Sequence, residues 1–327
     1  MTAIRPLALL ATAAASVALL ACGGGGASET GGPGAGPTVT VATAHGAVAV
    51  PVTRERIWAL DEYAALSLLA LDVVPEHAGR LFDDEKVRRL LADGGTELVD
   101  PVNVELVAAA RPTMIVGVRH PETERLLSRL RRIAPVVTLD ERDPWQEQLA
   151  VLAAVTGRRA NAAALVRRVD RATDALAARL ASSDDAGATV SVLATYPDRY
   201  FAYDDGTPLG RMLERLGFER PAAQIDDDED DYGFEEISPE LLREHRGDIV
   251  VSLVDDAYTG GRSVHDDARF DFDGSTMVEV DYLGWFSPTP LSAWWILHDV
   301  EAVLLDGEPP ASAGDAPELW RRMTGAG

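Results

Sequence analysis

The middle of the chain contains one uninterrupted helical run, and this run constrains the fold more than any other feature. Residues 158–180, RRANAAALVRRVDRATDALAARL, are mostly Ala, Leu and Arg and include neither Gly nor Pro. At about 1.5 Å per residue such a helix spans roughly 35 Å, which is more than a single small lobe needs. We therefore expect a bridging helix over residues 158–182 that holds two separate bodies face to face.

Strand and helix patterns alternate on both sides of this run. The apolar segments 48–53, 56–60, 113–118 and 136–140 before it, and 188–195, 248–254 and 276–281 after it, are typical of strands. Helical patterns lie between them, for example at 103–110, 122–133, 210–218 and 291–305. This alternation predicts an α/β fold of two Rossmann-like lobes, residues 38–157 and 183–327, with a ligand cleft between them.

The first 37 residues carry a targeting pattern. Arg5 precedes an apolar run over residues 7–20, which suits a signal peptide at residues 1–21 and is short for a membrane span. The chain's only cysteine, Cys22, follows Leu-Leu-Ala in a segment that resembles the bacterial lipobox, at which the signal is cleaved and the cysteine is lipidated. Residues 22–37 are rich in Gly and predict a flexible tether. The alternatives are a signal cleaved elsewhere or an uncleaved anchor.

The charge balance and the missing motifs exclude several classes of function. Acidic side chains number 53 against 30 basic ones, and the net charge of −23 would repel nucleic-acid phosphates. The chain has no GxSxG, HExxH or P-loop motif, and its six histidines lack metal-ligand spacing. We therefore expect a binding protein and no enzyme, with an extracytoplasmic metal-dependent hydrolase as the remote alternative.

Five segments in order resemble the substrate-binding lipoproteins of bacterial ABC importers for iron–siderophore complexes. They are RIWALDEYAALSLLALDVVP, VNVELVAAARPTMIVG, RIAPVVTLD, EISPELLREHRGDIVVSL and DYLGWFSPTPLSAWWILHDVEAVL. The resemblance implies a monomer, held by its lipid (palmitate) on the extracytoplasmic face of the cell membrane. It would capture a ferric siderophore, need no cofactor, and deliver the ligand to an ABC permease with its ATPase subunits. Cobalamin, haem, or bare Zn²⁺ or Mn²⁺ remain alternative ligands.

Ligands of open α/β sheets bind beyond the carboxyl ends of strands, so the candidate site residues are those that follow the expected strands. They are Glu62, Tyr63, Arg80, Arg119, His120, Tyr203, Tyr232, Phe234, Trp285 and Phe286. Arg80 follows a strand expected around residues 73–74, and the resemblance implies that an arginine in such a loop meets the ligand's oxygens. Trp285 and Phe286 lie in GWFSPTP, expected as a loop, where aromatic faces suit a partly apolar chelate.

Simpler explanations stand beside these assignments. Glu62 would complement the dipole at a helix N-terminus, and Arg80 would be an ordinary surface arginine. No protein ligand to iron is expected, because a siderophore saturates its metal. The acidic run at residues 226–231 is expected to be a solvated loop, since it lacks the glycine and glutamate positions of a calcium-binding EF-hand.

Overall fold

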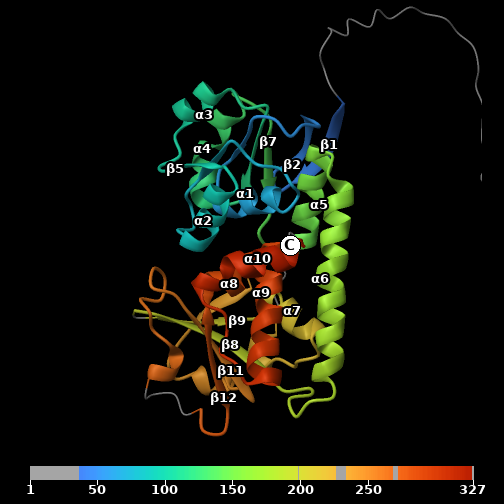
Figure 1. Ribbon diagram of the computed structural model, residues 1–327. Helices are drawn as coiled ribbons and strands as arrows, with labels where there is room; N and C mark the ends of the chain where they lie inside the picture. Colours follow the sequence, from blue (N-terminus) through green and yellow to red (C-terminus); the bar gives the residue numbers. More distant parts are fainter. Residues whose placement is uncertain (1–36, 198, 226–232, 268–271, 326–327) are drawn as a thin grey trace, which may run out of the picture. The chain divides into compact units, whose positions relative to one another are not determined.

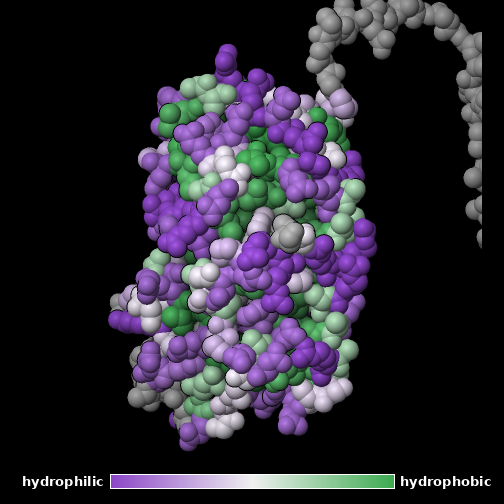
Figure 2. Space-filling view, viewed as in Figure 1, coloured by the Kyte–Doolittle hydropathy of each residue, from purple (hydrophilic) through white to green (hydrophobic). Residues whose placement is uncertain are grey.

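The computed structural model describes residues 37–197, 199–225, 233–267 and 272–325, which belong to one compact unit, Gly36–Gly327. The segments expected as signal peptide and tether, with Cys22, Tyr232 and the acidic run at residues 226–231, lie outside the described residues. The described helices include none that combines the length and the apolar character needed to cross a membrane. The face in Figure 2 is mostly hydrophilic, as the charged composition requires.

The N-terminal lobe is built on a parallel sheet of five strands with the order β5-β4-β3-β6-β7. Its strands are β3 (Ile57–Ala59), β4 (His77–Gly79), β5 (Glu97–Val99), β6 (Met114–Val118) and β7 (Val136–Leu139). The helices are α1 (Glu62–Leu69), α2 (Glu85–Asp93), α3 (Val104–Ala110), α4 (Pro121–Leu130) and α5 (Trp145–Thr156). Alternate side chains of β3 serve opposite faces, because Ile57 packs in the core with α1 and Trp58 packs with α3 and α4.

An antiparallel hairpin precedes this sheet. Its strands are β1 (Thr38–Thr43) and β2 (Gly46–Pro51), and β1 contacts α5 and β7. The segment expected as the first strand of the parallel sheet therefore belongs to a separate hairpin. The strand expected around residues 73–74 lies slightly later, as β4.

The C-terminal lobe is built on a mixed sheet with the order β10-β9-β8-β11-β12. Its strands are β8 (Val190–Tyr196), β9 (Arg199–Tyr203), β10 (Phe234–Ile237), β11 (Ile249–Val254) and β12 (Thr276–Asp281). The Rossmann-like parallel pattern holds for β8, β11 and β12, whereas β9 is antiparallel to both of its neighbours. The reversal arises because only two residues separate β8 from β9, and so short a connection joins antiparallel strands only.

Helices and short turns cover this second sheet. The helices are α7 (Pro208–Arg215), α8 (Tyr282–Phe286), α9 (Pro290–Val300) and α10 (Ala316–Thr324), and a π-helical turn, η4 (Glu301–Asp306), continues α9. The 3₁₀ turns are η1 (Ala222–Gln224), η2 (Leu242–His245), η3 (Val264–Asp266) and η5 (Ala313–Asp315). The segment expected as a loop after β12 instead begins with α8, because the Asp281 side chain accepts a hydrogen bond from the Gly284 N–H at 2.6 Å and caps that helix.

Helix α6 (Arg159–Leu180) is the expected bridging helix, and Figure 1 shows it running alongside both sheets. Its buried residues recur every three or four positions, from Ala162 to Leu180, and this face contacts α5, α9 and α10. Gly157, in the left-handed conformation at φ 69°, ends α5 just before α6 begins. Helix α10 also contacts α2, so the C-terminal segment returns to the N-terminal lobe.

Candidate functional site

A cavity of about 720 Å³ lies between the two lobes. The N-terminal lobe lines it with residues that follow β4, β6 and β7. The C-terminal lobe lines it with residues that follow β11 and β12, together with α7, the turn before α7 and the start of β10. These lining residues are Leu81, Phe82, His120, Pro121, Glu141, Arg142, Asp143, Gly206, Thr207, Pro208, Arg211, Gly233, Phe234, Tyr258, Tyr282, Leu283, Phe286 and Pro288. The cavity thus lies where open sheets place their ligands.

Phe82 forms part of the N-terminal wall, and two buried residues of α1 hold it there. The Glu62 carboxylate accepts hydrogen bonds from the backbone N–H groups of Leu81 and Phe82 at 2.8 and 3.1 Å. The Tyr63 ring stacks on the Phe82 ring with 4.3 Å between centroids. Glu62 and Tyr63 are buried behind the wall, so they support Phe82 and do not line the cavity.

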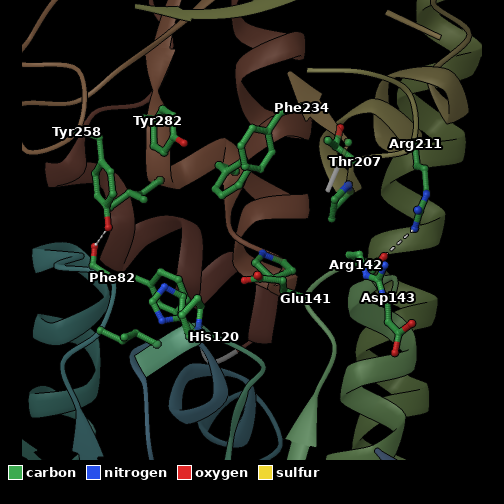
Figure 3. Close-up of a pocket in the computed structure, with 18 residues that line it drawn as sticks. Phe82, His120, Glu141, Arg142, Asp143, Thr207, Arg211, Phe234, Tyr258 and Tyr282 are labelled. Atoms are coloured by element: carbon green, nitrogen blue, oxygen red, sulfur yellow. Dashed lines mark hydrogen bonds between the residues drawn. The ribbon is translucent and has the colours of Figure 1, made fainter. Parts of the chain in front are cut away.

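His120 faces the cavity beside Phe82 (Figure 3). Its Nδ1 accepts the backbone N–H of Glu122 at 3.3 Å and so caps α4. An accepting Nδ1 carries no proton, so in the neutral ring Nε2 holds the N–H. Burial lowers the pKa of His120, which favours this neutral form. His120 therefore offers one neutral hydrogen-bond donor for a ligand.

The C-terminal wall is aromatic. Phe234 and Phe286 lie 5.9 Å apart between ring centroids, and Tyr282 lies 5.4 Å from Phe286. Tyr203 is buried behind them, with its hydroxyl 3.0 Å from that of Tyr282. The ring of Tyr258 stacks on Tyr282 at 5.4 Å. These contacts form a continuous aromatic surface suited to a partly apolar ligand.

Two hydrogen bonds across the cavity join the lobes, and both are drawn in Figure 3. The Tyr258 hydroxyl donates to the Phe82 carbonyl at 2.5 Å. The Arg211 guanidinium donates to the Arg142 carbonyl at 3.3 Å. The cavity is therefore bounded by both lobes at two of its edges.

The segment after β7 contributes a charged wall. Arg142 donates to Asp140 at 3.1 Å, and Arg119 lies 3.5 Å from the same carboxylate. Burial and, to a smaller extent, the neighbouring Asp61 charge together raise the pKa of Glu141 to about 7. Asp61 is itself fully buried, and burial raises its pKa to about 7 as well. Glu141 therefore gains or loses its charge near neutral pH inside the cavity.

The structure brings together part of the expected set of site residues. His120, Phe234 and Phe286 line the cavity, while Glu62, Tyr63 and Tyr203 lie directly behind its walls, and Arg119 lies beside it on Asp140. Their contact with a ligand stays a prediction. Tyr232 lies outside the described residues.

Two expectations are corrected. Arg80 does not line the cavity, because its guanidinium is paired with Asp83 and Asp100 and faces a separate surface hollow. Trp285 is 2% exposed, and its Nε1–H donates to the buried carboxylate of Asp299 at 2.8 Å. Helix α8 directs Trp285 toward α9, whereas a loop was expected there.

Other lining residues were missed. Glu141, Arg142 and Asp143 follow β7, and Tyr258 follows β11, so the strand-end rule that selected His120 could have found them. Thr207 and Arg211 carry no such signal, because their position depends on where α7 packs in three dimensions. Among the described residues, no cluster of three His, Cys, Asp or Glu side chains is suited to hold a metal ion.

The family model described as periplasmic binding protein matches residues 82–263. The chain belongs to the periplasmic binding protein family. The two-lobed α/β fold expected from the sequence is confirmed.

Known relatives of this periplasmic binding protein agree with the assignment. The chain is 26% identical over 211 residues to a protein of Bacillus subtilis (strain 168) named as a probable siderophore-binding lipoprotein, YfiY. The match spans 62% of this chain and 64% of that relative, slightly less than two thirds of the relative's length.

Solved structures share the fold. Staphylococcus aureus SirA, complexed with staphyloferrin B, has a TM-score of 0.69 at 18% identity, covering 81% of this chain and 97% of its own. The FhuD protein from S. pseudintermedius also has a TM-score of 0.69 at 18% identity, covering 82% and 98%.

Proposed function

We propose that the chain captures a ferric siderophore in the cavity between its lobes and delivers it to an ABC permease. The observation that carries this proposal is the cavity itself, to which both lobes contribute aromatic rings and hydrogen-bonding groups. The names of the relatives support it, since YfiY is described as siderophore-binding and SirA was solved with staphyloferrin B. A further similar structure, S. aureus FhuD2, holds ferrioxamine B.

The chemistry of the lining suits an iron chelate whose metal is already saturated. Phe82, Phe234 and Phe286 offer aromatic faces to the apolar part of a ligand. His120 and Arg211 offer N–H donors to its oxygens, and no side chain needs to replace a chelate ligand on iron. The volume of about 720 Å³ falls within the usual range for small-molecule pockets, roughly 300–1,000 Å³.

The cellular arrangement is part of the proposal. Cleavage after residue 21 would leave a lipidated Cys22, and residues 22–37 would tether the protein to the extracytoplasmic face of the cell membrane. Residues 38–157 and 183–327 would then act as two lobes on the bridging helix of residues 158–182. A permease and its ATPase subunits would receive the ligand, and the protein itself would act as a monomer with no cofactor.

The test is a ligand panel on the purified full chain. Ferrioxamine B, staphyloferrin B, a ferric catecholate, cobalamin, haem and Zn²⁺ are titrated separately, and binding is followed by native mass spectrometry and tryptophan fluorescence. We expect at least one ferric siderophore to bind with the highest affinity. Binding of cobalamin, haem or Zn²⁺ with no response to any ferric siderophore would refute the proposal.

A matched pair of variants then tests the location. Phe286→Ala removes a ring from the aromatic wall and should weaken siderophore binding by up to about tenfold, since an aromatic contact contributes roughly 0.5–1.5 kcal/mol beyond the area it buries. Leu241→Ala, at a side chain that is 45% exposed away from the cavity, should leave the affinity unchanged. Equal affinities for both variants would place the ligand elsewhere.

A further inference from the structure

The chain contains one lysine, Lys86, although it contains 29 arginines. Lys86 lies in α2, and its side chain is only 6% exposed. The position of Lys86 in the fold explains why this cation is buried. The same position indicates a role that is separate from ligand contact in the cavity.

The ammonium group of Lys86 lies between carboxylates of both lobes. Its Nζ is 2.8 Å from the Oδ1 of Asp281 in the C-terminal lobe and 3.2 Å from the Oδ1 of Asp84 in the N-terminal lobe. It also lies 5.7 Å above the centre of the Trp295 ring in α9. Burial alone would lower the pKa of Lys86, but the two carboxylates outweigh burial and raise it, so the side chain is charged.

The partner in the C-terminal lobe is directly connected to the cavity wall. Asp281 ends β12 and caps α8, where its Oδ1 also accepts the Gly284 N–H at 2.6 Å. Helix α8 supplies Tyr282, Leu283 and Phe286 to the cavity. A single carboxylate oxygen therefore receives both the cap bond of this helix and the ammonium group of the other lobe.

The geometry favours a lysine over an arginine at this position. An ammonium is compact and directs three donors outward, so it can meet two carboxylates while an indole ring covers it. A guanidinium is a wider planar fork and would have to displace Trp295, which is fully buried. Elsewhere in the chain arginine supplies every side-chain cation of this kind.

We propose that Lys86 is a positioning residue: it ties the N-terminal lobe to the cap of α8 and thereby sets the aromatic wall of the cavity. The lobes separate for ligand exchange only when the Lys86–Asp281 pair breaks. Opening leaves Lys86 with Asp84 as its only carboxylate partner of the pair and removes the ammonium from Asp281, so breaking this buried contact is costly and the opening is rare. The part of the inference that concerns ligand exchange rests on the proposed function, and the ion pair itself does not.

Chemical acetylation of Lys86 measures how often the lobes separate, and it needs no ligand. The full chain is treated with an amine-acetylating N-hydroxysuccinimide ester, and modification at each position is measured by peptide mass mapping. An Arg89→Lys variant carries an internal reference on the same helix, since the Arg89 side chain is 75% exposed. We expect position 86 to react at least about 100-fold more slowly than position 89, because it reacts only from the open state.

Two substitutions, each made in the Arg89→Lys variant, show which lobe's carboxylate protects Lys86 from acetylation. Asp281→Asn keeps a residue that can cap α8 but removes the charge, and it should speed modification at position 86 by about tenfold or more. Position 89 should be unaffected. Equal rates at positions 86 and 89, or protection lost in Asp84→Asn but kept in Asp281→Asn, would overturn the proposal, because Lys86 would then be held within its own lobe.

A binding test connects the pair to the cavity, with ferrioxamine B as the probe. Lys86→Met should speed its dissociation, followed by stopped-flow tryptophan fluorescence, by about tenfold or more, while Arg89→Met should not change it. In an Asp281→Asn background Lys86→Met should add little, which a general loss of folding would not produce. Unchanged dissociation in Lys86→Met would refute the positioning role. If ferrioxamine B does not bind at all, the proposed function loses support while the acetylation result still decides the ion pair.

Discussion

Replacing Trp285 with phenylalanine should destabilise the protein and leave ligand binding intact. The indole Nε1–H donates at 2.8 Å to Asp299, a carboxylate that is 1% exposed. Phenylalanine keeps an aromatic ring in the same core position but cannot donate this bond. The perturbation therefore isolates one buried interaction between α8 and α9.

The magnitude follows from the surroundings of Asp299. A hydrogen bond to a charged buried acceptor contributes about 1.5–3 kcal/mol, and the smaller ring adds about 1 kcal/mol for the void it leaves. The backbone N–H of Ala311 donates at 2.7 Å to the other oxygen of Asp299, Oδ1, so Oδ2 loses its donor and the lost bond should fall at the upper end of its range. We expect the free energy of unfolding to decrease by about 3–4 kcal/mol.

Urea unfolding followed by circular dichroism measures this change. The matched control is Trp294→Phe, because Trp294 is half-buried in the same region; it should cost less than about 1 kcal/mol. A decrease below about 0.5 kcal/mol for Trp285→Phe would refute the reasoning. So would a large loss of siderophore affinity at unchanged stability, because Trp285 would then belong to the cavity.

Three further predictions concern pH, packing and the contact between lobes. The pKa of Glu141 is about 7 in the folded state, above its ordinary value, so its contribution to stability is complete below pH 4.5 and is lost as the pH rises through 7. Between pH 5 and 8, the free energy of unfolding measured in urea should decrease by about 1–2 kcal/mol more for the native chain than for Glu141→Gln. Identical decreases would contradict the burial of this carboxyl. The added methyl group of Gly79→Ala would overlap the carbonyl oxygen of Leu60, so this variant should lower the free energy of unfolding by about 2 kcal/mol or more. The control Gly314→Ala should change it little, because the nearest atom to the added group is 3.5 Å away. Equal thermal midpoints for the two variants would disprove the close approach of β4 to β3. Tyr258→Phe removes the hydroxyl that donates across the cavity and should cost about 1 kcal/mol in the same unfolding assay, whereas no change would show that the bond is absent in solution.

The sequence predicts the framework of this fold because its strongest signals are local. Strand β6 is buried along its whole length and appears as the apolar run MIVGV, and the ends of α6 lie within two residues of the expectation since Gly157 precedes it and a Ser/Asp/Gly segment follows. Strand β4 is three residues, HAG, without a β-branched side chain. It is a strand because it pairs with β3 and β5, which no local pattern encodes.

For the candidate site too, the sequence predicts what depends on local position and misses what depends on contacts in three dimensions. His120 was accessible to sequence reasoning, because a strand-end position is a local property. Arg80 was misplaced since its partners Asp83 and Asp100 come from the turn beside it and from the end of β5, and those pairs decide where the guanidinium lies. Trp285 was misplaced because the cap at Asp281 converts an apparent loop into a helix. Side-chain direction depends on such contacts, and the sequence pattern alone does not contain them.

The position of α10 gives the assembly of this protein a temporal order. Its buried residues Ala316, Leu319 and Met323 complete a core in which α9 and α6 were synthesised earlier, and the helix also contacts α2 from the first lobe. A chain emerging from the ribosome therefore lacks the contacts that α10 makes with both halves until this last helix has been made. During that interval the interior surfaces of both halves stay incompletely covered, which favours chaperone binding.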